Sequence, residues 1–277
     1  MNVYISADAE GATALVSSAE LYPGEPEYEF CREMMTADVN AAIGGAFDGG
    51  ATEVLVNDSH WTQRNLLPQA LDPRAELIRG QAKPLGMMEG VEGMDCAFFV
   101  GYHARVGESD GVGNETILGR ELYAIRMNGE TVGEAEINAA VAGHFGVPVT
   151  MASGDDLFER EIRKTIPEIE FAVTKYAIDR WAARCLSPDV THAAIARAAK
   201  AAVRKAPRAR PVVLEGPVTF EVDFVSSSAA NTASWVPGAT RKGGRRAAFT
   251  GAGILEARRG LSALLTIGRT GSDRIYG

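Results

Sequence analysis

The stretch VYISADAEG, residues 3–11, decides the fold because an apolar, β-branched run leads directly into two carboxylates. Residues 3–7 predict a buried β-strand, and Asp8 and Glu10 follow at its end. Side chains alternate across a strand, so residues two positions apart project to the same side. Asp8 and Glu10 therefore point at one spot, where a cation would relieve the repulsion between their charges.

The rest of the first half alternates strand-like runs with helical stretches, which is typical of a mainly parallel α/β sheet flanked by helices. Asn128-Gly129 lies between two β-branched runs and predicts a hairpin. Glu134 begins a predicted helix after that hairpin. Further strands are expected at residues 53–56, 76–78, 96–100 and 147–152, and a long helix at about 27–47, ended by the glycines at 49 and 50.

The pattern of predicted strands and helices changes near residue 152, and we expect a second, smaller α/β lobe beyond it. Residues 1–152 would form a metal-binding lobe, and residues 153–277 would complete the substrate site and the oligomer contacts. In this second part, strands are expected near residues 169–173, 212–214, 218–224 and 247–250, and helices near 155–165, 188–205, 226–234 and 251–266.

Composition excludes some classes of function. The formal net charge is −8, which disfavours nucleic acid as a partner because phosphate binding needs clustered Lys and Arg. No window offers the roughly 20 apolar residues of a membrane span. Cys31, Cys96 and Cys185 are odd in number and lack a CxxC pair, so they predict buried thiols and a cytoplasmic location.

Two histidines extend the pair of carboxylates. His60 and His103 each follow a predicted strand through a short loop. Ligands of open α/β sheets bind beyond the carboxyl ends of the strands, so both imidazoles are expected at the same edge as Asp8 and Glu10. Mixed imidazole and carboxylate ligands suit zinc first, then manganese, iron or cobalt. Such a metal would activate water and polarise a carbonyl group.

Each of these residues also has a plainer interpretation. Carboxylates at strand ends are often turn formers or helix caps, and a single histidine there is often only hydrogen-bonded. His144 and His192 lie within predicted helices without a partner at metal spacing, and we interpret them as structural. Gly111-Val112-Gly113 does not lead from a strand into a helix, which disfavours nucleotide binding, and no GxSxG motif indicates a serine nucleophile.

Several motifs together resemble the D-aminopeptidase family of zinc metallopeptidases, of the type associated with dipeptide-transport operons. The resemblance covers nearly the whole chain. It is carried by Ser6-Ala7-Asp8-Ala9-Glu10-Gly11, Val56-Asn57-Asp58-Ser59-His60, Gly101-Tyr102-His103-Ala104-Arg105 and Val132-Gly133-Glu134. It implies a site with two Zn²⁺ ions, an α/β fold and a ring-based homo-oligomer, often a decamer. In this site Asp8 would bridge the ions, and the other ligands would be Glu10, His60, His103 and Glu134.

The chain departs from the family pattern at one position. The family has a histidine, proposed as nucleophile or base, where this sequence appears to have Asn114, followed by Glu115. Three alternatives follow: metal-activated water attacks while Asn114 orients the substrate, Glu115 serves as the base, or the substrate is not an ordinary D-amino-acid peptide. Asn114 as a simple loop residue stays open as well. Arg105 is a further candidate for substrate contact.

The sequence thus predicts a metal-dependent hydrolase of amide or peptide bonds that acts on small peptides or amino-acid amides. Asn114 motivates an alternative, a metal-containing but catalytically silent member that binds such molecules. A metal-dependent hydrolase of another small amide or ester, including a phosphate ester, is a third hypothesis. It is weaker for phosphate esters because no cluster of Arg or Lys accompanies the ligands.

Overall fold

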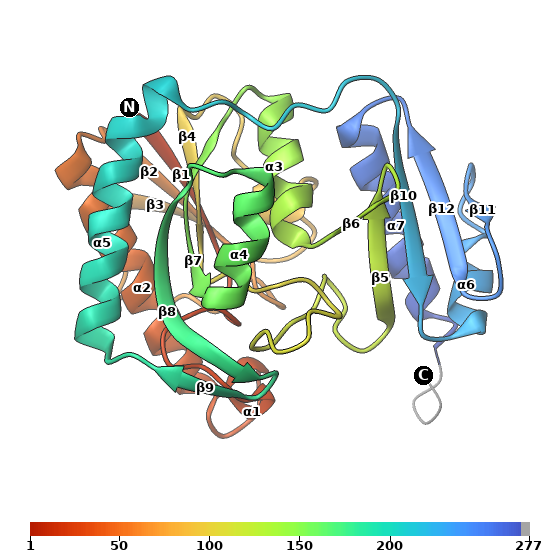
Figure 1. Cartoon of the computed structure of the whole chain (residues 1–277), viewed down its shortest axis with the longest axis horizontal. Coiled ribbons are helices and arrows are strands. Elements are labelled where there is room, and N and C mark those ends of the chain that lie inside the picture. Colours follow the sequence, from red (N-terminus) through yellow and green to blue (C-terminus); the bar gives the residue numbers. More distant parts are fainter. Residues whose placement is uncertain (273–277) are drawn as a thin grey trace.

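The computed structural model describes residues 1–272, and its larger sheet has seven strands in the order β3-β2-β1-β4-β7-β8-β9 (Figure 1). The first six strands in this order run parallel, and β9 is antiparallel to β8. This confirms the expected mainly parallel sheet. The strands are β1 (Asn2–Ala7), β2 (Glu53–Asp58), β3 (Ala75–Ile78), β4 (Cys96–Val100), β7 (Val149–Asp155), β8 (Glu170–Asp179) and β9 (Ala182–Cys185).

A second, antiparallel sheet has the order β11-β12-β10-β5-β6. The predicted hairpin joins β5 to β6, and both Asn128 and Gly129 have positive φ, as a tight hairpin turn requires. The strands are β5 (Leu122–Met127), β6 (Glu130–Val132), β10 (Val218–Phe224), β11 (Thr240–Arg241) and β12 (Arg246–Gly251).

Helices cover both sheets. Helices α2 (Tyr28–Gly49) and α5 (Pro188–Lys205) pack together on one face of the larger sheet, whereas α3 (Glu134–His144) and α4 (Asp156–Thr165) lie on the face toward the second sheet (Figure 1). Helix α7 (Ile254–Arg269) packs against β10 and β12 and also contacts α3. The shorter elements are α1 (Ser18–Leu21), α6 (Ser227–Ala233), η1 (Gly86–Met88) and η2 (Ala206–Arg208).

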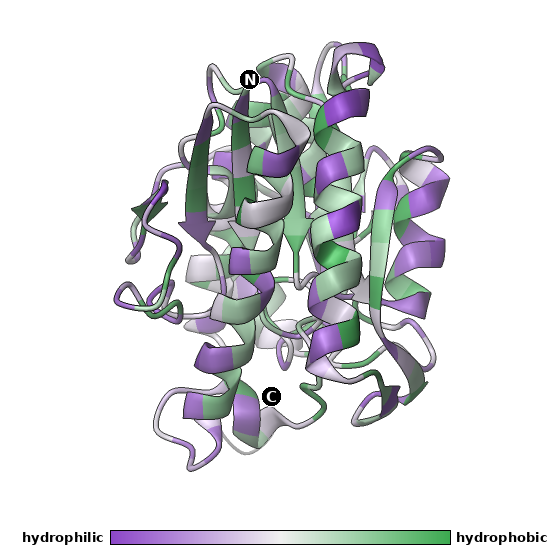
Figure 2. Ribbon diagram, turned by 90° about the vertical axis from the view of Figure 1, so that its left-hand side faces the viewer, coloured by the Kyte–Doolittle hydropathy of each residue, from purple (hydrophilic) through white to green (hydrophobic). Residues whose placement is uncertain are grey.

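Two apolar cores follow from this layering. One core lies under α2 and α5, whose hydrophilic and hydrophobic residues alternate along each helix (Figure 2), and the buried apolar residues of both helices pack against the sheet. The other core lies between the two sheets and joins residues of α3, α7 and β10. The second core ties the sheets together, so a site at the edge of the larger sheet can receive side chains from both.

Some predicted features differ in the structure. Residues 212–214 form an irregular segment rather than a strand, because the chain crosses α3 there, and the Val212 carbonyl oxygen lies 1.8 Å from where a Cβ on Gly143 would be. Cys185 is exposed on β9, whereas Cys31 and Cys96 are buried as expected. Both sheets draw strands from either side of residue 152, so the division into residues 1–152 and 153–277 stays a prediction.

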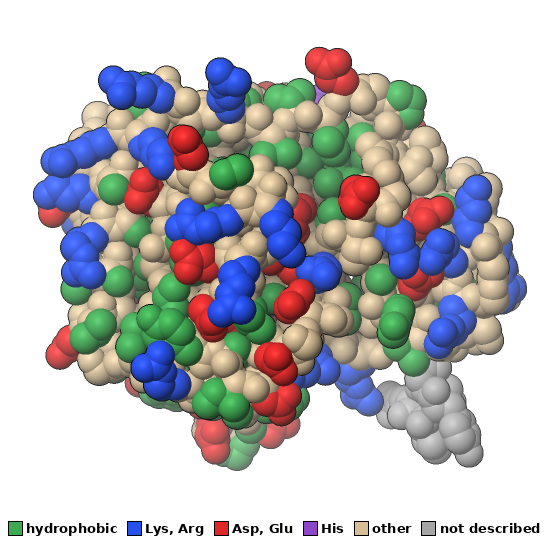
Figure 3. All heavy atoms as spheres, viewed as in Figure 1, with side chains coloured by type: hydrophobic (Ala, Val, Ile, Leu, Met, Phe, Trp, Pro, Cys, Tyr) green, Lys and Arg blue, Asp and Glu red, His purple; other side chains and the backbone are tan. Residues whose placement is uncertain are grey.

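The surface mixes charges of both signs. On the face shown in Figure 3, Lys and Arg side chains are interspersed with Asp and Glu side chains over both sheets. Among the described residues, no helix combines the length and the apolar character that crossing a membrane requires.

The contact between α2 and α5 gives a test of the packing. A Cβ on Gly45 would lie 2.2 Å from the Ala196 carbonyl oxygen, whereas a Cβ on Gly44 would meet nothing within 4 Å. We predict that Gly45→Ala destabilises the protein by about 1–3 kcal/mol, the range for overpacking. The matched change Gly44→Ala should stabilise it by up to about 1 kcal/mol, since Ala favours helix. Urea unfolding followed by circular dichroism measures the free energy of unfolding of both variants. Equal changes in the two variants would contradict the close contact of Gly45 with α5.

Candidate metal centre

Three neighbouring strands bring the predicted residues together. Asp8 follows β1, His60 follows β2 and His103 follows β4, and these strands are adjacent in the order β2-β1-β4. Backbone hydrogen bonds continue past the strand ends, since Asp8 N donates to Val100 O and Ser59 N donates to Ala7 O, each at 2.8 Å. The side chains therefore emerge from one rigid edge, at the point where the strand order changes direction: β2 and β3 lie on one side of β1, and β4 and β7 lie on the other.

Glu134 reaches the same place from the second sheet. It is the first residue of α3, directly after the hairpin strand β6. Its Oε1 accepts a hydrogen bond from Ile117 N at 2.7 Å. Gly133 before it is fixed in turn, because Gly133 N donates to Glu136 Oε2 at 2.9 Å. The hairpin thus aims Glu134 at the edge of the other sheet.

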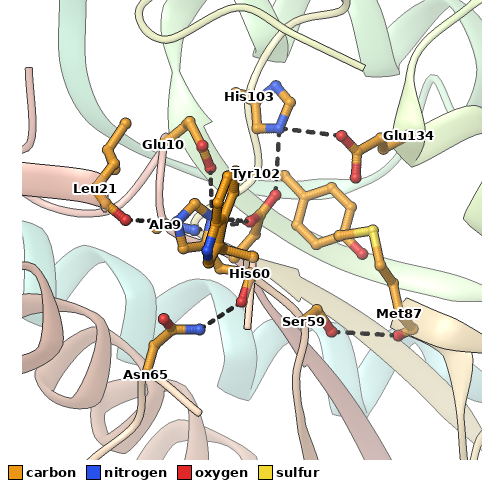
Figure 4. Close-up of polar contacts among 12 residues, drawn as sticks. Ala9, Glu10, Leu21, Ser59, His60, Asn65, Met87, Tyr102, His103 and Glu134 are labelled. Atoms are coloured by element: carbon orange, nitrogen blue, oxygen red, sulfur yellow. Dashed lines mark hydrogen bonds and ion pairs between the residues drawn. The ribbon is translucent and has the colours of Figure 1, made fainter. Parts of the chain in front are cut away.

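The five side chains are buried and form one cluster, of which Figure 4 labels Glu10, His60, His103 and Glu134. His60 Nδ1 lies 3.3 Å from Asp8 Oδ1 and 3.2 Å from Glu10 Oε2. His103 Nε2 lies 3.3 Å from Asp8 Oδ2 and 3.6 Å from Glu134 Oε1. Asp8 stands between the two imidazoles, with one oxygen toward each. All five residues that the sequence predicted as ligands are therefore brought together.

The outer nitrogen of each histidine contacts the main chain. His60 Nε2 lies 3.0 Å from Leu21 O, and His103 Nδ1 lies 3.0 Å from Ala104 O. A carbonyl can only accept, so each of these nitrogens carries a proton and donates it. The opposite nitrogen of each ring faces the carboxylates, and it is the one that can offer a lone pair when a metal takes the place of a proton there.

The atoms at the centre of the cluster fit a cation. Within residues 1–272, Asp8 Oδ2, Glu10 Oε2 and His103 Nε2 are buried and have no hydrogen-bond partner. Buried polar atoms normally have one, because an unsatisfied buried acceptor costs roughly 1–3 kcal/mol. One ligand atom each from Asp8, Glu10 and His103 lie within 4.8 Å of one another, and so do those from His103, Glu115 and Glu134. These donors are the types that bind zinc.

The pKa shifts report an excess of buried negative charge. Burial, with the charges of Glu10 and Glu134, raises the pKa of Glu115 to about 8. Burial likewise raises the pKa of Glu134 to about 7, although His103 opposes the rise. Burial acts to lower the pKa of His60, but the charge of Glu10 and contact with Asp8 outweigh it and raise that pKa well above its usual value.

Asp8 differs from the other acids. Burial acts to raise its pKa, but the close contacts with His103 and then His60 outweigh burial and hold the Asp8 pKa well below its usual value. Asp8 is therefore the carboxylate that stays charged at the centre of the cluster. A carboxylate that stays charged between two imidazole nitrogens is suited to bind a cation.

The three other candidates lie differently. Glu115 is half-buried beside His103 and Glu134. Asn114, one residue earlier, points elsewhere, since its Nδ2 donates to Glu108 O at 2.6 Å. The Arg105 guanidinium pairs with Glu161 Oε2 at 2.5 Å and with Glu108 Oε2 at 3.2 Å. The structure thus brings Glu115 to the cluster, and it brings neither the Asn114 amide nor the Arg105 guanidinium there.

Sequence analysis missed supporting residues whose signal was too weak. Lys175 is fully buried, and its Nζ donates to the carbonyl oxygens of Glu10 and Ala12 at 2.6 and 2.9 Å, which fixes the loop after β1. A lysine in a strand gives no such signal by itself. His192, interpreted as structural, does have an acidic partner, because its Nε2 lies 3.2 Å from Asp38 Oδ1 on α2.

Two cavities open onto the cluster, and Glu115 lines both. One, of about 330 Å³, is lined by Asp8, His60 and Glu134 together with Trp61, Met87 and Arg258. The other, of about 310 Å³, is lined by Glu10 with Tyr22, Arg180 and Trp181. Both volumes are at the lower end of those that bind small ligands. The cluster is therefore accessible to a small molecule.

We predict that Asp8→Asn sharply lowers the zinc bound per subunit, because loss of a direct ligand should cost more than the roughly 10–100-fold in affinity that an outer-shell change costs. Zinc should also raise the melting temperature of the wild type, by mass action, and raise that of Asp8→Asn much less. Asp38→Asn is the matched control: Asp38 is buried outside the cluster, so its loss should lower stability but not zinc content. Elemental analysis decides, and full zinc occupancy in Asp8→Asn would contradict the assignment.

Comparison with known proteins gives the family. The model of the M55 peptidases, described as D-aminopeptidase, matches residues 1–263. A D-aminopeptidase of Bacillus subtilis (strain 168) is 36% identical over 246 residues, which are 88% of this chain and 89% of that protein. The solved structure of the Zn-dependent D-aminopeptidase DppA from Bacillus subtilis, described as a self-compartmentalizing protease, matches with a TM-score of 0.95 at 33% identity, over 99% of this chain and 100% of that chain. The predicted α/β fold and the predicted class, a metal-dependent hydrolase of peptide or amide bonds, are confirmed, and the chain belongs to the D-aminopeptidase family.

Proposed function

We propose that this protein removes an N-terminal D-amino acid from short peptides or amides, with zinc bound by the cluster. One observation carries the proposal: three buried ligand atoms, on Asp8, Glu10 and His103, lack hydrogen-bond partners within the described residues and face one another. The Zn-dependence of DppA, which is 33% identical, supports the choice of metal. The D-specificity is supported by the family alone.

In this proposal the cluster would hold two zinc ions, with Asp8 as its central ligand. Glu10 and His60 complete one side of the cluster, and His103 and Glu134 complete the other, as their distances to Asp8 and to each other suggest. Bound zinc would supply Lewis acidity, which makes water more acidic and polarises a carbonyl oxygen. The backbone contacts of both histidines keep their ring orientations fixed, so the ligands need little rearrangement to bind.

Glu115 is the proposed general base. It lines both cavities and lies beside His103 and Glu134, so its carboxylate is within the space that an attacking water and a leaving amine would share. Glu115 would take the proton from the water and give it to the nitrogen of the breaking bond. Glutamate can perform both transfers, whereas the amide of Asn114 cannot take up a proton at neutral pH.

Asn114 and Arg105 are proposed to hold the loop that carries Glu115. The Asn114 amide donates to Glu108 O, and the Arg105 guanidinium reaches both Glu108 and Glu161. Val106 N also donates to Thr116 Oγ1 at 3.1 Å, which closes the loop on both sides of Glu115. These contacts leave neither side chain free to bind substrate. We therefore propose that Asn114 and Arg105 act indirectly, by fixing the position of Glu115.

We also propose that the protein is a homo-oligomer, possibly a decamer, and cytoplasmic. The oligomer is supported by the description of DppA as a self-compartmentalizing protease. The location is supported by all three cysteines being free. Light scattering of the purified protein measures the first, and fractionation of the source cells measures the second.

Zinc removal and substrate stereochemistry test the function. We predict that the zinc-loaded protein hydrolyses D-alanyl-glycine much faster than L-alanyl-glycine, and that dialysis against a chelator abolishes the activity until zinc is restored. Product release followed by chromatography measures both rates. Activity that survives complete chelation would show that the cluster is not the hydrolytic centre. Binding of D-alanyl-glycine without turnover would favour the silent binding member instead.

Glu115→Gln tests the base separately. We predict that it lowers kcat by roughly 10²–10⁴-fold, the range of general acid–base catalysis, while zinc content stays that of the wild type. Asp110→Asn is the matched control, because Asp110 is an exposed carboxylate in the same loop and should leave kcat within a few-fold. A Glu115→Gln variant with normal kcat and full zinc would assign the proton transfer to another group.

A further inference from the structure

Arg258 lies on helix α7, which packs on the second sheet, and it brings a positive charge into one of the two cavities beside the cluster. It lines the same 330 Å³ cavity as Asp8, His60 and Glu134. Its side chain reaches across to the larger sheet, since Nη2 lies 3.2 Å from where a Cβ on Gly86 would be, at the start of η1. Arg258 therefore lies between the two sheets, facing the space next to the cluster.

The Arg258 guanidinium lacks a counter-charge. Its Nη1 donates to Ser262 Oγ, a neutral acceptor one turn along α7. Its Nε is buried and, among residues 1–272, has no hydrogen-bond partner. In the same part of the chain no carboxylate oxygen lies within 4.0 Å of its nitrogens, and the nearby acid Glu134 is turned to His103 and Ile117 N.

A partly buried guanidinium without a counter-charge is destabilising. Arginine stays charged at any physiological pH, so it cannot avoid the loss of hydration by losing its proton. Burial of a charge lowers stability unless another charge or hydrogen bonds compensate for the lost hydration. A protein retains such a group where a ligand supplies the missing charge, and the planar guanidinium fits a carboxylate with two parallel hydrogen bonds.

We propose that Arg258 binds the C-terminal carboxylate of the substrate and so makes the enzyme selective for very short peptides with a free carboxyl end. The inference rests on the proposed function, since it places the substrate in the same cavity. The cavity volume of about 330 Å³ supports a short substrate, because a longer chain would carry its carboxylate beyond the cavity. Specificity would thus come from the second sheet, and hydrolysis from the edge of the first.

The second cavity also contains arginines, and among residues 1–272 Arg180 Nε, like Arg258 Nε, is buried without a hydrogen-bond partner. Arg120 is exposed and therefore solvated. The Arg180 guanidinium lies 5.2 Å from the centre of the Trp181 ring, which offers a cation–π contact. This cavity includes neither Asp8, His60 nor Glu134 among its lining residues. The cavity that contains Arg258 is thus the better place for the carboxylate of a substrate that spans the cluster.

Comparison of a free acid with its amide tests the proposal. We expect the zinc-loaded wild type to hydrolyse D-alanyl-glycine with a kcat/KM about 10–100-fold above that for D-alanyl-glycinamide, the range of one charge-assisted hydrogen bond. Arg258→Met should remove this preference by lowering the value for the acid and leaving that for the amide within a few-fold. Arg258→Lys should restore part of it. Arg259→Met is the matched control, because Arg259 is the exposed neighbour on α7 and does not line the cavity.

Binding separates this inference from the proposed function. Calorimetry in the Glu115→Gln background should show tighter binding of the acid than of the amide, and this difference should vanish with Arg258→Met. If the wild type cleaves neither compound but shows this binding, the inference stands and the hydrolase function falls. If Arg258→Met lowers hydrolysis of acid and amide equally, or if Arg180→Met rather than Arg258→Met removes the preference, the inference is wrong while the function stands. Normal zinc content and melting temperature of each variant confirm folding.

Discussion

The structure depends on four acidic side chains being gathered in one poorly solvated place. Asp8, Glu10, Glu115 and Glu134 meet at the end of the larger sheet, with only two imidazoles among them. In a medium of low dielectric constant, like charges at such distances repel strongly. The raised pKa values of Glu115, Glu134 and His60 lessen that repulsion, because the cluster can take up protons where a cation could bind. Cation binding and the folded arrangement are therefore energetically linked.

The surrounding protein resists the relaxation that this repulsion would otherwise cause. Lys175 fixes the main chain at Glu10 and at Ala12 just after it. The Tyr102 hydroxyl lies 2.7 Å from Ser6 Oγ and accepts from Asn138 Nδ2 at 3.0 Å. The Tyr102 ring also stacks on Phe99, with 4.5 Å between ring centres. These contacts join β1, β4 and α3 directly behind the ligands. A site on such rigid elements keeps its geometry without the ligand, which reduces the free energy lost on binding.

Whether a site residue could be predicted from the sequence depends on the kind of element that carries it. Asp8, His60 and His103 were predictable because parallel topology alone sends the ends of neighbouring strands to one edge. Glu134 came from the family resemblance, since nothing local says that a hairpin of another sheet aims it there. The loop before β5 was harder to predict. The resemblance pointed to Asn114, with Glu115 named only as an alternative base, and the structure places Glu115 beside the cluster. In a strand the alternation of side chains predicts which of two neighbouring residues faces a site. An irregular loop has no such alternation, so the sequence does not show which of Asn114 and Glu115 faces the cluster.

Arg258 lay beyond any such reasoning because its role depends on how two sheets pack. A single arginine in an amphipathic helix is usually solvated, and α7 carries a second arginine, Arg259, directly beside it. Only the core shared by α3, α7 and β10 turns one of the two toward η1 and leaves the other exposed. The same core fixes the distance between Arg258 and the metal ligands. A change of packing between the sheets would therefore alter which substrates fit, while the ligand residues on the larger sheet stayed in place. Substrate preference can thus diverge in this fold without a change in the residues proposed to bind metal.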